Sequence, residues 1–89
     1  MNFEETKSVL ENIDEQDGFT PSDLLDLPEE IVPILRQMMT RKGKSLTDLS
    51  HHFHMQENQT HQILDIMQHK GLVQQNMRQN QIVYTAKLK

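Results

Sequence analysis

The sequence contains no cysteine. This absence excludes disulfide bonds, thiolate metal sites, iron–sulfur clusters and cysteine nucleophiles. No apolar run approaches the ~18 residues that a membrane-spanning helix needs, and the acidic start of the chain lacks the basic and apolar stretches of a secretory signal. We therefore expect a soluble, cytoplasmic protein that does not associate with a membrane.

Apolar residues are also scarce, making up 35% of the 89 residues. Globular chains usually contain about 45–50% apolar residues when glycine is counted, so part of this chain is expected to stay outside the core. A chain of this length is long enough for one domain and too short for two. We expect a single small core.

Charge is divided unevenly along the chain. Residues 1–30 carry ten acidic side chains and one basic one, whereas residues 31–89 carry eight basic and three acidic side chains. We therefore divide the chain into an acidic leader with short helical segments, residues 1–27, and a mildly basic body, residues 28–89. The leader either stays solvated and poorly ordered, or it folds back on the basic surface of the body or competes with a polyanion for that surface.

Two short helical segments are predicted in the leader. Apolar residues at helical spacing predict a helix at about 3–14, ended by Asp17-Gly18. The run Thr20-Pro21-Ser22-Asp23 has the cap, the proline and the acid of a helix start, and Pro28 ends that second segment. The first segment presents an apolar face that either forms a dimer interface or covers the core of the same chain. That face consists of Phe3, Val9, Leu10 and Ile13.

The body begins with two predicted helices. Pro28-Glu29-Glu30 is a start signal for the first, which should continue to about Thr40. This helix is either kinked at Pro33 or begins near Val32, because proline is tolerated only in the first turn. The second helix is predicted at about 47–53, since Leu46, Leu49 and Phe53 fall on one face, with Ser45 or Leu46 before it and Thr47 as a possible cap.

The strongest periodic signal predicts a third body helix at 57–69. Its apolar stripe is Thr60, Ile63, Leu64 and Met67. Gly71 is well placed to end this helix in the left-handed conformation. Two β-forming segments then predict a hairpin, with 72–75 paired to 82–86 across the polar stretch 76–81. Met77 lies at the hairpin tip and is expected to be exposed.

The order of these elements resembles the winged helix-turn-helix domain, a mainly α fold with a small β hairpin (α+β). Ser50 stands where that family has a small residue inside the second helix, facing the third. At the turn, His54 stands where the family usually has glycine, so we expect the turn to be longer than usual. The resemblance covers residues 28–89. It is carried by residues 46–55, by Thr60, Ile63, Leu64 and Met67, by Lys70-Gly71-Leu72-Val73 and by Ile82-Val83-Tyr84-Thr85.

The resemblance implies a role in binding double-stranded DNA. Helix 57–69 should lie in the major groove, and the hairpin should reach the flanking minor groove or backbone. Residues 56–81 include eight glutamines and three asparagines, whose amides pair well with adenine edges. The candidate DNA-binding residues are Gln56, Asn58, Gln59, His61 and Gln62 on the helix, with Lys44 and Arg78 as backbone contacts.

The charge of the helix opposes tight DNA binding. It has no Lys or Arg before Lys70 and carries Glu57 and Asp65, although neutralised phosphates supply most of the affinity for DNA. We therefore expect a transcriptional regulator of modest intrinsic affinity, and a homodimer would add cations. The alternative is an adaptor, a protein-interaction module that does not bind DNA directly.

The five histidines do not predict a metal site, because no two of them are four residues apart on a helix. No nucleophile elbow, phosphate-binding glycine loop or metal pair indicates catalysis. We expect no enzyme activity, no metal and no cofactor. The histidines instead predict that mild acidification strengthens DNA binding, because it adds positive charge to the basic body.

Overall fold

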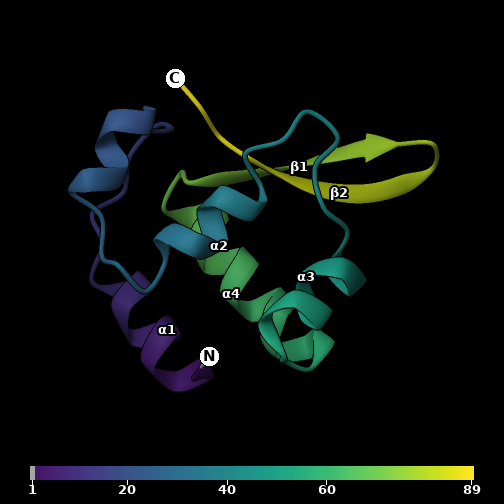
Figure 1. The fold of residues 1–89 in the computed structure, drawn as a ribbon, viewed down its shortest axis with the longest axis horizontal. Coiled ribbons are helices and arrows are strands. Elements are labelled where there is room, and N and C mark those ends of the chain that lie inside the picture. The colour runs from purple at the N-terminus through teal and green to yellow at the C-terminus, as the bar shows by residue number, and fades with distance from the viewer. Residues whose placement is uncertain (1) are drawn as a thin grey trace.

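A computed structural model describes residues 2–89, so Met1, the first residue of the leader, lies outside the described residues. Helices and a two-stranded antiparallel hairpin make an α+β winged-helix arrangement, which confirms the predicted fold (Figure 1). The elements in chain order are α1 (Phe3–Glu11), the 3-10 helix η1 (Pro21–Leu25), α2 (Val32–Gln37), α3 (Leu46–Phe53), α4 (Glu57–His69), β1 (Val73–Arg78) and β2 (Gln81–Ala86).

The core forms where α3 and α4 pack together, as the apolar stripes predicted. The stripe of α4 is buried along its whole length, and α3 contributes Leu49 and Phe53 to the same cluster. Gly71 follows α4 with φ +79°, so the predicted left-handed end of this helix is confirmed. The polar side of α4 is thereby left facing outward.

Helix α2 begins at Val32, which places Pro33 in the first turn and resolves the two predicted alternatives in favour of an unkinked helix. The prediction that it continues to about Thr40 is wrong. It ends at Gln37, and the carbonyl of the next residue, Met38, accepts a hydrogen bond of 2.8 Å from the Ala86 amide of the hairpin. The chain after Gln37 is thus bonded to β2.

Helix α3 begins one residue earlier than predicted, because the Ser45 side chain caps it by accepting from the Asp48 amide. Thr47 is not the cap. The turn to α4 contains three residues, so the expectation of a lengthened turn is wrong. His54 itself adopts the left-handed conformation, with φ 55°, and the next amide bonds back to the Ser50 carbonyl at 3.1 Å. A histidine thus occupies a conformation that usually selects glycine or asparagine.

The hairpin is longer and its turn tighter than the sequence indicated. Pairing runs from Val73↔Ala86 to Arg78↔Gln81, so the stretch expected to be a polar loop belongs to the strands. Gln79 and Asn80 form the turn with φ 49° and 64°, the two positive values of the hairpin turn whose twist matches that of the strands. The Asn76 side chain also bonds across to the Thr85 hydroxyl at 2.9 Å. Amides therefore stabilise this β1–β2 hairpin, the wing of the fold, which they were expected to interrupt.

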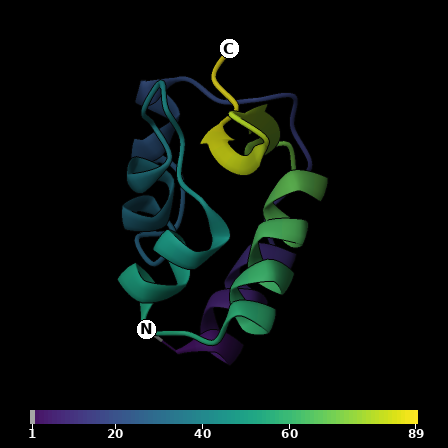
Figure 2. The same ribbon diagram turned by 90° about the vertical axis from the view of Figure 1, so that its right-hand side faces the viewer.

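The acidic leader is part of the fold, and its interpretation as a solvated, poorly ordered segment is wrong. α1 packs along α4 (Figure 2), and Leu10 and Phe19 are fully buried in the common core. The Phe19 backbone forms an isolated parallel bridge with Leu88. Leu10 is fully buried and Phe3, Val9 and Ile13 pack, partly buried, against the core, so the apolar face of α1 covers the chain's own core.

The start of η1 is held by a reciprocal pair of hydrogen bonds between Thr20 and Asp23. The Thr20 amide donates to the Asp23 carboxylate at 2.8 Å, and the Asp23 amide donates to the Thr20 hydroxyl at 3.3 Å. The bond from the Thr20 amide lowers the pKa of Asp23 below its ordinary value. This capping box fixes η1 and sets the position of the leucines that follow it.

The capping box gives the folded state an acid-sensitive element. A carboxyl whose pKa is lowered by folding stabilises the protein above its unfolded pKa of about 3.9, and the contribution is lost as pH falls through the lower, folded value. We expect Asp23→Asn to reduce the loss of stability that acid causes below about pH 4. Urea unfolding between neutral pH and pH 3 measures this. An unchanged acid dependence in Asp23→Asn would show that the carboxylate has no such role.

Candidate nucleic-acid interface

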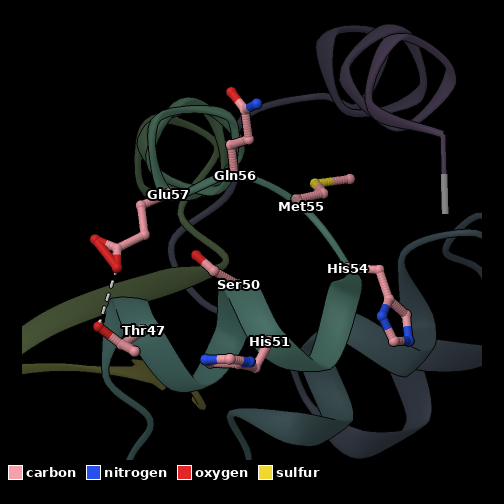
Figure 3. Close-up of a pocket in the computed structure, with 7 residues that line it drawn as sticks. All are labelled: Thr47, Ser50, His51, His54, Met55, Gln56 and Glu57. Carbon is pink, nitrogen blue, oxygen red and sulfur yellow. Dashed lines mark hydrogen bonds between the residues drawn. The ribbon is translucent and has the colours of Figure 1, made fainter.

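The predicted base-contacting residues lie on or just before α4. Asn58, His61 and Gln62 are exposed and share one face of the helix, which the spacing of three and four residues required. Gln56 is the exposed N-cap residue, and Figure 3 shows its side chain directed away from α3. Gln59 is half-buried, so less of its amide is available to a ligand. A contact between any of these residues and DNA stays a prediction.

Both acids of α4 are engaged by neighbouring side chains. Glu57 accepts a hydrogen bond of 3.2 Å from the Thr47 hydroxyl, which joins the first turns of α3 and α4 (Figure 3). Asp65 lies 3.5 Å from Nδ1 of His61, one turn earlier on the same exposed face. Asp65 therefore stands beside a predicted base contact, and His61 offsets its charge only when protonated.

The two predicted backbone contacts come from different elements. Arg78 is exposed on β1, next to the turn of the wing. Lys44 is half-buried, and its backbone is fixed by two hydrogen bonds to Tyr84, from the Lys44 amide at 3.0 Å and to the Lys44 carbonyl at 2.8 Å. The loop before α3 is thus joined to the edge of the hairpin.

A cleft lies between this loop, the start of α3 and the wing. Lys42 and Arg78 both line it, together with Ser45, Asp48 and Gln79. The cleft combines two cations with one acid and several polar groups, a composition suited to an anionic backbone. In sequence Lys42 is only one base in the run Arg41-Lys42-Gly43-Lys44, and its position in the same cleft as Arg78 depends on the fold.

Gly43 explains how the loop approaches the hairpin so closely. It has φ +73°, and a Cβ atom built on it would lie 2.8 Å from Cγ2 of Thr85 and 2.9 Å from the Tyr84 carbonyl oxygen. Only glycine fits both the conformation and the space without displacing a neighbour. Lys42 and Lys44 are therefore held on either side of a fixed contact with the wing.

A second, shallow groove lies between α3 and the start of α4 (Figure 3). Ser50 is buried, and its hydroxyl has no hydrogen-bond partner among residues 2–89. The residue fulfils the predicted packing role of a small side chain where α3 faces α4. All five histidines are exposed, and no group of three His, Asp or Glu side chains in the described part of the chain is arranged to hold a metal ion.

Comparison with protein families matches residues 31–85 to the family described as FeoC like transcriptional regulator. The match runs from just before α2 to the end of β2 and covers more than half of the chain. The chain belongs to the FeoC-like transcriptional regulator family. No curated protein and no solved structure matched it.

Membership of the FeoC-like family indicates a regulatory, non-enzymatic role with DNA or protein as the partner. The family match includes α4, the cleft between loop and wing, and each predicted site residue, whereas α1 and η1 precede it. Within residues 2–89, no helix has the length and apolar character needed to cross a bilayer.

Proposed function

We propose that this FeoC-like protein regulates transcription by binding double-stranded DNA with modest intrinsic affinity. Helix α4 would enter the major groove, and the wing would lie along the flanking backbone or minor groove. The observation that carries the proposal is the cleft that Lys42 and Arg78 both line, next to the Lys44 backbone that is paired with Tyr84 of β2. It supplies phosphate contacts that α4 itself lacks.

The cleft between loop and wing and the exposed face of α4 would contact different parts of the DNA. Cations of the cleft would contact phosphates, which fix the register of a protein on DNA without reading sequence. The exposed amides of α4, Asn58 and Gln62, would read base edges, with adenine as the preferred partner. The affinity for DNA stays modest because the surface offers few cations and α4 itself carries two acids, Glu57 and Asp65.

The proposal predicts a steep dependence of DNA affinity on salt. If three to four phosphates are neutralised, affinity should fall about 40- to 150-fold between about 50 and 200 mM salt. Fluorescence anisotropy with a labelled duplex measures this for the full chain. Replacing Lys44 and Arg78 together with alanine should weaken binding to all sequences and lower the salt slope by about two.

The matched control replaces Asn58 and Gln62 with alanine. This variant removes amides and no charge, so it should keep the salt slope and lose preference among duplexes of different sequence. Equal effects of the two double variants on the salt slope would contradict the assignment of backbone and base contacts. Absence of binding by the full chain at low salt would reject DNA as the ligand.

One observation favours a second function, that of an adaptor for a protein partner. α1 lies against α4 and carries the exposed acids Glu4, Glu5 and Glu11, so the folded leader places negative charge beside the helix proposed to enter DNA. Like charge within a Debye length of about 8–10 Å lowers affinity for a polyanion. A partner protein bound through α4 with little salt dependence would support the adaptor.

A further inference from the structure

An apolar groove lies between η1 and α2, outside the surfaces already described. It is lined by Leu24, Leu25, Leu27 and Val32, with Glu29 and Arg36 also at its walls. Leu25 is 89% exposed, the highest value among the exposed large apolar side chains of the described residues. Fold stability does not account for an outward-facing leucine beside a groove of other leucines, because such a side chain removes little apolar surface from water.

The groove is fixed before any partner arrives. The capping box of Thr20 and Asp23 holds the start of η1, while Leu24 and Leu27 pack against the core cluster from one side. Fully buried Ile31 secures the chain as it enters α2. A preformed groove requires little ordering on binding, and this reduces the entropic cost of association.

The charge around the groove restricts what can bind there. Residues 20–36 carry four acids and one base, and Asp26, Glu29 and Glu30 are exposed near the leucines. Arg36 is the single cation and lies toward the α2 side. A second copy of this chain docked groove to groove, or an anionic bilayer, would bring like charge against these acids. A positively charged partner would instead be attracted to the groove.

We propose that this groove binds a basic amphipathic helix of a partner protein. The apolar face of that helix would cover Leu25 and the adjoining leucines, and its Lys or Arg side chains would lie beside Asp26, Glu29 and Glu30. Figure 1 places η1 and the tip of the wing at opposite ends of the molecule. The groove is therefore separate from the proposed DNA surface, and both can be occupied together.

The test uses a synthetic peptide of leucine and lysine, about 14 residues long, with leucines at helical spacing. It is titrated into the full, isotope-labelled chain, and amide shifts and peptide anisotropy are recorded. We expect saturable binding with shifts centred on residues 24–36. Leu25→Gln should weaken binding about 10-fold or more, because Leu25 becomes buried under the bound peptide and supplies much of the apolar contact. Glu29→Gln should weaken it about two- to five-fold.

Two controls separate this site from general attraction to an acidic chain. Met77→Gln alters a side chain that is 67% exposed at the wing, and it should leave peptide affinity unchanged. A scrambled peptide of the same composition should bind at least about 10-fold more weakly, because it lacks a continuous apolar face. Leu25 is exposed, so its replacement does not endanger the fold.

Other results would overturn the proposal. These are equal binding of the scrambled peptide, an unchanged affinity in Leu25→Gln, equal binding of a leucine–glutamate peptide, or shifts centred outside the groove. Self-association of the chain through Leu25, seen as concentration-dependent shifts that the peptide does not reverse, would assign the groove to a second copy instead. Each result is independent of whether the chain binds DNA.

Discussion

Gly71→Ala is expected to lower the midpoint of thermal unfolding by about 12 °C or more. A Cβ atom at this position would lie 1.5 Å from the carbonyl oxygen of Gln16, and φ is +79°. The conformation alone costs alanine about 1–2 kcal/mol. The overlap must then be relieved by moving the leader away from the end of α4.

Moving the leader disrupts the hydrogen bonds that hold it. The Gln16 amide bonds to the Lys70 carbonyl and the Gly18 amide to the Gly71 carbonyl, each at 2.9 Å, and Phe19 enters the core directly afterwards. Together these losses bring the expected cost to about 3–5 kcal/mol, a large share of the 5–15 kcal/mol typical of a domain. In a domain of this size each kcal/mol shifts the midpoint by about 4–8 °C.

Thermal unfolding followed by circular dichroism measures the effect, with Asn80→Ala as the matched control. Asn80 has φ 64° in the exposed turn of the wing, so its replacement imposes the conformational cost without the overlap. We expect a loss of about 1–2 kcal/mol there. A Gly71→Ala protein no less stable than Asn80→Ala would show that the leader does not press on this glycine.

Local patterns in the sequence were sufficient to predict the helix pair α3 and α4 and the way α4 ends. The stripe of Thr60, Ile63, Leu64 and Met67 fixes which side of α4 is buried, and it therefore also fixes the exposure of Asn58 and Gln62. Gly71 was identified because a left-handed helix end selects glycine. Such inferences need only neighbours along the chain.

The partner of the leader was not predictable by the same means. The spacing of Leu10 and its neighbours indicates an apolar face, but a periodic pattern does not say what covers that face. The answer depends on contacts between residues far apart in sequence, such as the Gln16 amide with Lys70 and Phe19 with Leu88. The high charge of the leader also favoured the wrong prediction, a solvated segment, although Leu10 and Phe19 of this leader are fully buried.

In the candidate site, too, local spacing predicted some residue positions, and contacts between distant segments determined the others. Helical spacing placed Asn58, His61 and Gln62 together on α4, whereas the position of Lys42 and Arg78 around one cleft depends on how the loop docks against the wing. The length of the wing was not predicted, because a run of amide residues in a sequence is typical of a loop. In the structure, two residues with positive φ form a tight turn, and an amide side chain bonds across the strands, so most of this run belongs to the strands.

Removing residues 1–27 is expected to abolish cooperative folding of the remaining body, although the body holds the entire family match at 31–85. Leu10 and Phe19 are fully buried, and burial of each such side chain stabilises by about 1.5–3 kcal/mol. Loss of both, with the backbone bonds around Phe19, brings the stability of a small domain near zero. Circular dichroism melts and the dispersion of amide resonances measure this in the isolated 28–89 segment.

Point variants of the intact chain separate the loss of core contacts from the effects of truncation. Phe19→Ala should cost about 3–5 kcal/mol, while Leu25→Ala, a change at a side chain 89% exposed, should cost little. Adding a synthetic peptide of residues 1–27 should restore structure to the 28–89 segment, because the leader docks mainly through contacts with the body. A 28–89 segment that melts cooperatively at the midpoint of the full chain would instead establish the body as an independent domain, with the leader as an accessory to it.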